Sequence, residues 1–210
     1  MKKFGAALCM LLITLMAACS QPEKFPAIPK GATVLILGDS LSYGTGAKEG
    51  EDYPSLLAQT TGWKIINEGI PGDTTAGGLQ RLPNLLTQYQ PQLLIVELGG
   101  NDFLHQLPQS QTTANLKAIL ALAKTQNIQT VLVAIPEFNA LRAAVGNLAD
   151  HPIYEAICKE TSTPLIKDVF SDVLSDRSLK ADQIHPNAVG YLKTSQKMYE
   201  ALQDLGLVAI

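Results

Sequence analysis

Ser40, Asp182 and His185 have the side-chain types that acyl transfer needs. Ser40 lies in a Gly-Asp-Ser stretch, and His185 follows Asp182 by three residues. A serine hydroxyl becomes an effective nucleophile when a base takes its proton, and histidine suits that task at neutral pH. A carboxylate then holds the imidazole in the correct tautomer. These residues are therefore candidates for nucleophile, orienting acid and general base.

The spacing of Asp182 and His185 adds a geometric argument. Of the three histidines, only His185 combines an aspartate three residues before it with a proline directly after it. Pro186 biases His185 away from helical dihedral angles, so the stretch is expected to form a turn in which the carboxylate reaches Nδ1. The same pattern also occurs in turns without a catalytic role, and the spacing alone leaves that alternative open.

Several rival signatures are missing from the chain. Ser42 takes the place of the second glycine in a Gly-x-Ser-x-Gly elbow, and no Ser-x-x-Lys, His-Glu-x-x-His or cysteine–histidine zinc spacing is present. Gly44-Thr45-Gly46 continues into neither Gly-x-Gly-x-x-Gly nor Gly-Lys-Ser/Thr, which excludes a nucleotide-binding loop of those types.

Short apolar runs alternate with helical patterns and predict the frame around these residues. Strands are expected at 33–37, 63–67, 93–98, 130–135 and 164–166. Helices are expected at 53–60, 78–89, 112–126, 152–160 and 188–205. This alternation predicts a three-layer α/β/α sandwich with a flavodoxin-like parallel sheet of about five strands. The polar stretches follow strand ends, where such sheets bind ligands.

Composition indicates one ordinary globular domain. The chain has 210 residues, of which 46% are hydrophobic and 17% charged, which argues against disorder. A formal net charge of −3, from 16 basic and 19 acidic residues, leaves no basic surplus for nucleic acid. No internal repeat and no indication of oligomeric state is visible.

The first 18 residues have the pattern of a secretory signal peptide. Lys2 and Lys3 precede an uncharged stretch, 4–18, that is short for a membrane span. Its end, Leu15-Met16-Ala17-Ala18-Cys19, resembles the lipobox of bacterial lipoproteins. The alternative is an ordinary signal peptide cut before Cys19, which leaves a free thiol.

The lipobox resemblance implies an exported protein that is lipid-anchored through Cys19. Residues 19–30 are then expected to form a tether and residues 31–210 the domain. Ser20 after the cysteine implies sorting to the outer membrane, on its periplasmic side. Such an anchor is expected to hold the cleft near acyl lipids. Cys158, the one cysteine of the domain, is expected to be a small buried apolar residue rather than a catalytic thiol.

Four blocks of the chain together resemble the SGNH (GDSL) hydrolase family. In family order they are Gly38-Asp39-Ser40-Leu41-Ser42, Gly72-Asp73-Thr74, Gly99-Gly100-Asn101-Asp102 and Asp182-Gln183-Ile184-His185. One such block would be weak support, whereas four in order on the expected elements are strong. Residues 67–75, with Tyr53-Pro54 upstream, are most similar to the bacterial thioesterase, lysophospholipase and arylesterase branch.

The resemblance implies a serine esterase of the arylesterase or lysophospholipase type, which cleaves small acyl esters or thioesters through an acyl-enzyme without metal or organic cofactor. It assigns Ser40 as nucleophile, His185 as base and Asp182 as its orienting acid. The implied oxyanion hole uses the N–H groups of Ser40 and Gly72 and the amide of Asn101. Two alternatives stay open: an envelope carbohydrate O-acetylesterase, and a non-catalytic envelope-binding lipoprotein on a hydrolase scaffold. Pocket shape, expected to depend on residues 104–111 and 136–150, decides between substrates.

Other polar residues near these blocks have simpler expected roles. Three aspartates are expected to fix loops by hydrogen bonding: Asp39, Asp73 and Asp102. Ser42 is expected to cap or face the first helix. The remaining candidates are expected to be structural or solvated: His105 at the surface or the cleft mouth, His151 at a helix start, and Arg142, for which an anionic head group is the alternative partner.

Overall fold

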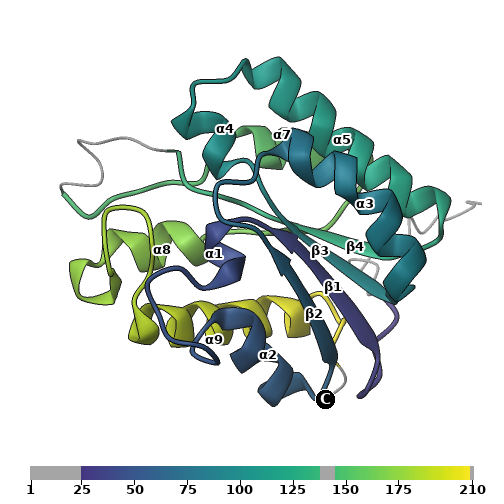
Figure 1. The fold of residues 1–210 in the computed structure, drawn as a ribbon, viewed down its shortest axis with the longest axis horizontal. Coiled ribbons are helices and arrows are strands. Elements are labelled where there is room, and N and C mark those ends of the chain that lie inside the picture. Colours follow the sequence, from purple (N-terminus) through teal and green to yellow (C-terminus); the bar gives the residue numbers. More distant parts are fainter. Residues whose placement is uncertain (1–24, 138–144, 209–210) are drawn as a thin grey trace, which may run out of the picture.

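A five-stranded parallel sheet forms the centre of the computed structural model, which describes residues 25–137 and 145–208 (Figure 1). Its strands are β1 (Thr33–Gly38), β2 (Lys64–Gly69), β3 (Leu93–Glu97), β4 (Gln129–Val133) and β5 (Leu165–Ile166). They pair in the order β2-β1-β3-β4-β5, and every pair is parallel. This is the flavodoxin-like order, so the predicted fold class is confirmed.

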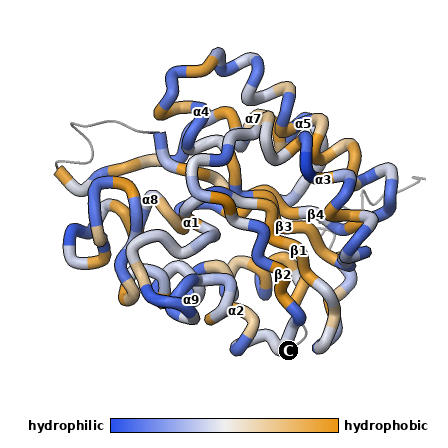
Figure 2. Tube along the Cα trace, viewed as in Figure 1, coloured by the Kyte–Doolittle hydropathy of each residue, from blue (hydrophilic) through white to orange (hydrophobic). Residues whose placement is uncertain are grey.

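Burial explains the apolar runs that predicted the strands. Every residue of β3 is buried, and so is every residue of β1 after Thr33, because helices cover both faces of the sheet. Figure 2 shows the hydrophobic residues concentrated along these strands. The edge strand β2 is only partly buried, which accounts for its weaker pattern.

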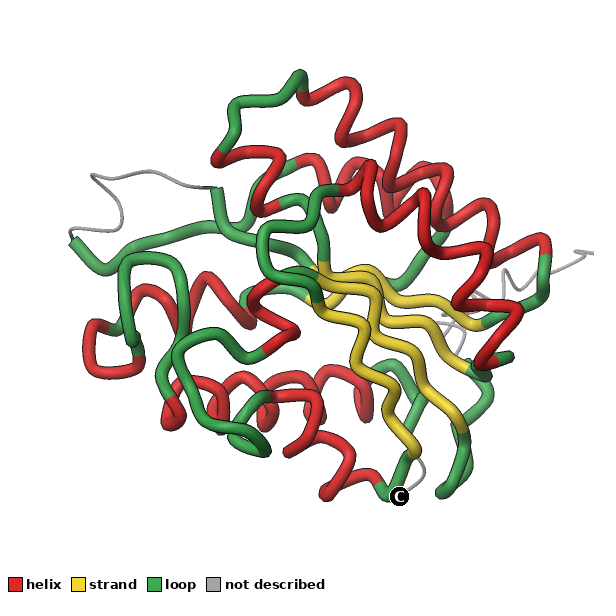
Figure 3. Tube along the Cα trace, viewed as in Figure 1, coloured by secondary structure: helices red, strands yellow, loops and turns green. Residues whose placement is uncertain are grey.

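Two helical layers enclose the sheet (Figure 3). One layer packs α3 (Thr75–Tyr89), α5 (Gln109–Thr125) and α7 (Ile153–Thr161) side by side, with contacts to β1 and β4. The other packs α2 (Tyr53–Thr61) and α8 (Val169–Ser175) against α9 (Ala188–Asp204). Two short helices, α1 (Ser40–Tyr43) and α4 (Gly100–Leu104), follow β1 and β3 at the carboxyl edge of the sheet, and a 3₁₀ turn spans Arg177–Leu179.

The five predicted helices exist, while the short ones were not predicted. Helices α1, α4 and α8 have 4, 5 and 7 residues, too few for a helical period to show. Helix α3 begins at Thr75 rather than Gly78, because Thr74 caps it by accepting from Gly77 N. Gly78 lies inside the helix, where glycine lets α3 pack closely against Leu98, since a Cβ there would come within 2.3 Å of Leu98 Cδ1.

Residues 25–30, predicted to belong to the tether, lie against the domain. Ile28 is buried, forms a parallel bridge with Val208, and accepts a hydrogen bond from Trp63 Nε1 at 3.2 Å. The predicted signal peptide, the lipidation site Cys19 and the rest of the tether lie outside the described residues, as does Arg142. In the part of the chain that the structure describes, no helix has the length and apolar character to cross a membrane.

Candidate active site

Ser40 is the first residue after a sharp turn at the end of β1. The Asp39 side chain caps the turn by accepting from Leu41 N at 2.9 Å, which confirms its predicted bracing role. Helix α1 ends after one turn at Gly44, whose φ of 94° suits glycine. Gly38 leaves room for the turn, because a Cβ there would lie 2.1 Å from Ser42 Oγ.

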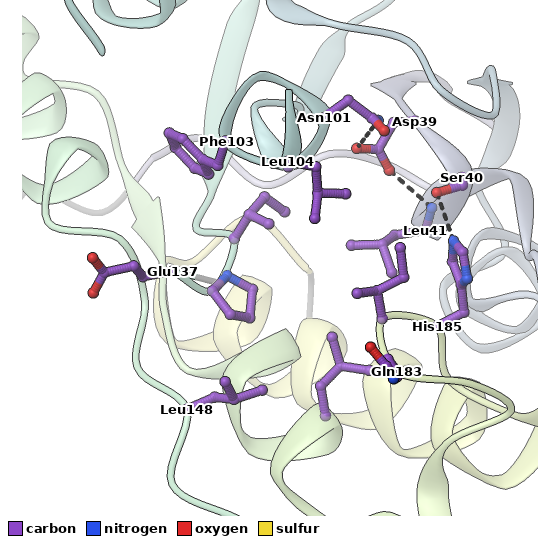
Figure 4. A pocket seen from close by; sticks show the side chains of 15 residues that line it. Asp39, Ser40, Leu41, Asn101, Phe103, Leu104, Glu137, Leu148, Gln183 and His185 are labelled. Atoms are coloured by element: carbon purple, nitrogen blue, oxygen red, sulfur yellow. Dashed lines mark hydrogen bonds between the residues drawn. The ribbon is translucent and has the colours of Figure 1, made fainter. Parts of the chain in front are cut away.

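The turn containing Asp182 and His185 brings the imidazole to Ser40. Asp182 Oδ1 accepts from the backbone N–H groups of Ile184 at 2.8 Å and His185 at 2.9 Å, so one carboxylate oxygen organises the turn. The second oxygen lies 2.7 Å from His185 Nδ1. His185 Nε2 in turn lies 2.9 Å from Ser40 Oγ, a contact drawn in Figure 4. Partial burial raises the Asp182 pKa, but hydrogen bonds from His185 and Ile184 lower it more, so it stays below its usual value.

Asn101 and Gly72 lie on two further segments of the carboxyl edge. Asn101 Nδ2 donates to Asp73 O at 2.8 Å and to Asp39 Oδ2 at 3.1 Å, which ties α4 to the turns after β1 and β2. Gly72 directly precedes Asp73 and has a φ of 81°, a conformation that favours glycine. Among the described residues, no acceptor is recorded for the N–H of Ser40 or of Gly72.

The neighbouring aspartates fix loops, as predicted. Asp102 accepts from Thr75 N at 2.9 Å and from Thr112 Oγ1 at 3.2 Å, joining α4 to α3 and α5. Asp73 pairs with Arg81 Nε at 2.8 Å, and the Arg81 guanidinium also donates to Gly38 O at 3.0 Å. These contacts hold the turns after three strands in one arrangement.

Two buried acids beneath the nucleophile turn were not anticipated as a pair. Glu97, the last residue of β3, is fully buried, and its Oε2 accepts from Ser42 N at 3.0 Å and Ser42 Oγ at 2.6 Å. Ser42 Oγ also lies 2.7 Å from Tyr53 OH, so Ser42 belongs to a buried network rather than to a simple cap. Burial raises the pKa of Asp39 to about 6 and the pKa of Glu97 well above its usual value. The sequence signal that could have identified Glu97 is its position as the one charged residue in the apolar run 93–98.

The remaining histidines and the cysteine lie apart from the triad arrangement. His105 is exposed at the end of α4. His151 stacks on Phe103 with ring centroids 4.2 Å apart and accepts from Ile153 N, which agrees with a structural role, and burial lowers its pKa. Cys158 is buried as predicted, and burial raises the pKa of its thiol to about 12.

A cavity of about 60 Å³ opens beside Ser40 and His185 (Figure 4). Its wall is mainly apolar and comprises Leu41, Phe103, Leu104, Ile135, Pro136, Leu148, Leu174 and Ile184, with Asn101, Glu137 and Gln183 among its polar members. Leu104, Pro136, Glu137 and Leu148 come from the two segments expected to shape the pocket, of which residues 138–144 lie outside the described residues. Helix α8 and the His185 turn supply walls that the sequence did not indicate. No group of three or more His, Cys, Asp or Glu residues in 25–137 and 145–208 is arranged to hold a metal ion.

Comparisons with known proteins agree with this geometry. A model of the GDSL-like Lipase/Acylhydrolase family matches residues 36–193. The chain is 38% identical over 179 residues to "Thioesterase 1/protease 1/lysophospholipase L1" of Escherichia coli, covering 82% of this chain and 84% of that protein.

Two solved esterase structures are also similar to the chain. The psychrotrophic esterase EstA from Pseudoalteromonas sp., inhibited by monoethylphosphonate, superimposes with a TM-score of 0.71 at 29% identity, over 82% of this chain and 97% of that one. The SGNH-hydrolase family esterase AlinE4 gives 0.64 at 30% identity, over 87% and 100%.

Proposed function

The chain belongs to the GDSL-like Lipase/Acylhydrolase family and is an ester hydrolase, and from this premise we propose that it cleaves short acyl esters and thioesters through an acyl-enzyme on Ser40. The observation that carries the proposal is the pair of contacts at His185, 2.9 Å from Nε2 to Ser40 Oγ and 2.7 Å from Nδ1 to Asp182 Oδ2. Nucleophile, base and orienting acid therefore have the geometry that proton transfer requires.

In the proposed first half-reaction, Ser40 Oγ attacks the acyl carbonyl while His185 Nε2 takes its proton. Asp182 keeps the other ring proton on Nδ1 and stabilises the imidazolium. The tetrahedral intermediate collapses as His185 gives its proton to the leaving oxygen or sulfur. Water then repeats the sequence on the acyl-Ser40 ester, releasing a carboxylic acid and restoring the serine.

The negative oxygen of the tetrahedral intermediate needs donors that are already in place. We assign this role to the backbone N–H groups of Ser40 and Gly72 and to Asn101 Nδ2. The first two have no recorded acceptor among the described residues, which leaves them free to donate. The Asn101 amide carries no proton that titrates near neutral pH, so it donates over a wide pH range.

Cavity size supports a short acyl group. An apolar cavity of about 150 Å³ admits one benzene, or roughly 25 Å³ per carbon, so the 60 Å³ beside Ser40 suits the first two or three carbons of an acyl group. Longer chains must leave through the mouth or displace the wall at Leu104 and Leu148. The same observation favours the second candidate function, an O-acetylesterase acting on an envelope carbohydrate.

We further propose that the enzyme is exported and lipid-anchored through Cys19, on the periplasmic side of the outer membrane. Phe25 donates its N–H to Leu205 O just after α9, and the next residue, Pro26, accepts from Gln129 Nε2 at the start of β4 at 3.3 Å, so the chain joins the domain at the amino edge of the sheet. The six residues from Cys19 to Phe25 reach about 20 Å when fully extended.

This attachment point changes the expected orientation of the cleft. A domain of this size is about 40 Å across, and Ser40 lies at the opposite edge of the sheet. With so short a tether, the cleft faces away from its own bilayer. Substrates then arrive through the aqueous phase as single molecules rather than from the anchoring membrane.

The test uses protein lacking residues 1–19, assayed on p-nitrophenyl esters from acetate to palmitate, with Ser40→Ala beside it. Activity that requires Ser40 and is highest from acetate to butyrate supports the proposal, and added activity on acetylated sugars favours the second candidate. A preference for palmitate contradicts the short-chain assignment. No Ser40-dependent hydrolysis by folded protein favours the binding alternative. Palmitate labelling of the full chain that disappears in Cys19→Ala tests the anchor.

A further inference from the structure

The N–H groups around Ser40 are divided between two buried carboxyls. Asp39 Oδ1 takes the N–H of Leu41 at 2.9 Å, while Glu97 Oε2 takes the N–H of Ser42 at 3.0 Å and approaches that of Asp39 at 3.4 Å. The N–H of Tyr43 is bonded to Asp39 O at 2.9 Å. In the described structure, Ser40 alone in this turn keeps an N–H without a recorded acceptor.

We propose that Glu97 is a positioning residue for the reaction: from beneath the turn, it accepts the N–H of Ser42 and approaches that of Asp39, and so leaves the Ser40 N–H as the one backbone donor of this turn directed at the oxyanion. This inference rests on the proposed function, in which Ser40 supplies both the nucleophile and one oxyanion donor. Glu97 itself touches no reacting atom, and it acts through Asp39 and Ser42.

The placement of Glu97 fits this role. It is paired in register with Gly38 across β1 and β3, directly below the turn, and its side chain is completely buried. A Cβ on residue 38 would come within 2.9 Å of Glu97 Oε2, so glycine at this position admits the carboxyl. Among the described residues no ion pair joins Glu97 to a cation, and a hydrogen bond with the Glu97 side chain lowers the pKa of Asp39, so the neighbour of this acid is a second buried acid. A buried acid without a counter-ion is costly, which argues for a specific task.

Positioning of the turn depends on the length of the Glu97 side chain and on its accepting oxygen rather than on its charge. The carboxyl must place one accepting oxygen against the turn, and burial beside Asp39 raises the pKa of Glu97 well above its usual value. A neutral acid still accepts through its carbonyl oxygen. Glutamine has the same reach and an accepting oxygen, whereas aspartate keeps the acid but is one methylene shorter.

Three variants separate these properties: Glu97→Gln, Glu97→Asp and Glu97→Met. We expect Glu97→Gln to keep kcat within about 5-fold, and Glu97→Asp and Glu97→Met to lose about 10- to 100-fold in kcat, less than deletion of a whole oxyanion donor. KM is expected to stay within about 2-fold, because none of these atoms lines the acyl cavity. The rate of fluorophosphonate labelling at Ser40 falls in the same order.

A matched control distinguishes positioning from general destabilisation. Leu94→Ala creates a buried defect three residues earlier on the same strand, and it is expected to lower Tm without changing kcat of the folded protein. If Glu97→Met does not fold, the comparison of Glu97→Gln with Glu97→Asp still decides. Wild-type kcat in folded Glu97→Met, or a Glu97→Gln slower than Glu97→Asp, overturns the inference. Absence of Ser40-dependent activity in the wild type would instead refute the proposed function.

Discussion

Truncating Asn101 to alanine tests the proposed oxyanion hole directly. The change removes the one side-chain donor assigned to the oxyanion and leaves the backbone donors of Ser40 and Gly72 in place. Asn101 lies on α4, a short helix that Asp102 holds through Thr75 and Thr112, so truncation at 101 leaves the helix anchored. The expected result is therefore a loss of rate without loss of fold.

The size of the loss follows from the resting contacts of the Asn101 amide. Removing one oxyanion donor typically costs about 3–4 kcal/mol of transition-state stabilisation. Here the amide already donates to Asp73 O at 2.8 Å and to Asp39 Oδ2 at 3.1 Å. To bind the oxyanion, it must give up the longer bond, worth about 1.5 kcal/mol for a charged acceptor. The difference, about 2 kcal/mol, corresponds to roughly 30-fold in kcat.

Steady-state kinetics on p-nitrophenyl acetate measure this difference. Asn115→Ala is a matched control, since Asn115 also donates from a partly buried amide, to Thr75 Oγ1 at 3.1 Å, but does not line the cavity. We expect Asn101→Ala to lower kcat about 30-fold and Asn115→Ala to leave it unchanged. A loss below about 3-fold in Asn101→Ala, or an effect confined to KM, would refute the assignment.

Three further predictions test other parts of the site. Asp182→Asn should lower kcat about 10²-fold, below the ~10⁴-fold known for a buried carboxylate, because Asp182 is 53% exposed and water screens it; kinetics within 5-fold of the wild type would contradict this. Burial raises the pKa of Asp39 from 3.8 to about 6. As the pH rises, this carboxyl therefore ionises in the unfolded chain before it ionises in the folded protein, and the free energy of unfolding of the wild type falls. Urea unfolding should thus show the stability of Asp39→Asn, relative to wild type, rising by about 2 kcal/mol from pH 4 to 6, and a falling difference would reverse the sign of this argument. In protein lacking residues 1–19, the Cys158 thiol, with a pKa of about 12, should react with a disulfide reagent at pH 8 only as fast as the chain unfolds; rapid labelling of native protein would show the site to be open.

The buried acid pair illustrates a trade between stability and activity. Asp39 and Glu97 are both buried, and burial makes each costly to ionise. Their oxygens nevertheless arrange the N–H groups of the turn that presents Ser40. Functional sites commonly retain such unfavourable groups where the reaction benefits from the geometry.

Much of this architecture follows from local sequence. Both faces of the central strands are covered, so β1, β3 and β4 show as continuous apolar runs, and the parallel order follows from helices between them. The Asp182–His185 turn is likewise local, because its hydrogen bonds span only two or three residues. The fold class and the pairing of these two residues could therefore be predicted.

Tertiary structure alone decided the rest, because the relevant contacts join residues far apart in the chain. His185 contacts Ser40 across 145 residues of sequence, and Glu97 accepts from Ser42 across 55. A local hydrophobic pattern does not predict contacts between residues so far apart in the chain. The acyl cavity takes walls from α4, α8 and the segment after β4, and its small volume depends on how those side chains pack. Packing likewise set Phe25 at the amino edge, opposite Ser40. Residue types and short-range hydrogen bonds thus determined the candidate chemistry, whereas long-range packing brought its residues together and shaped the cavity beside them.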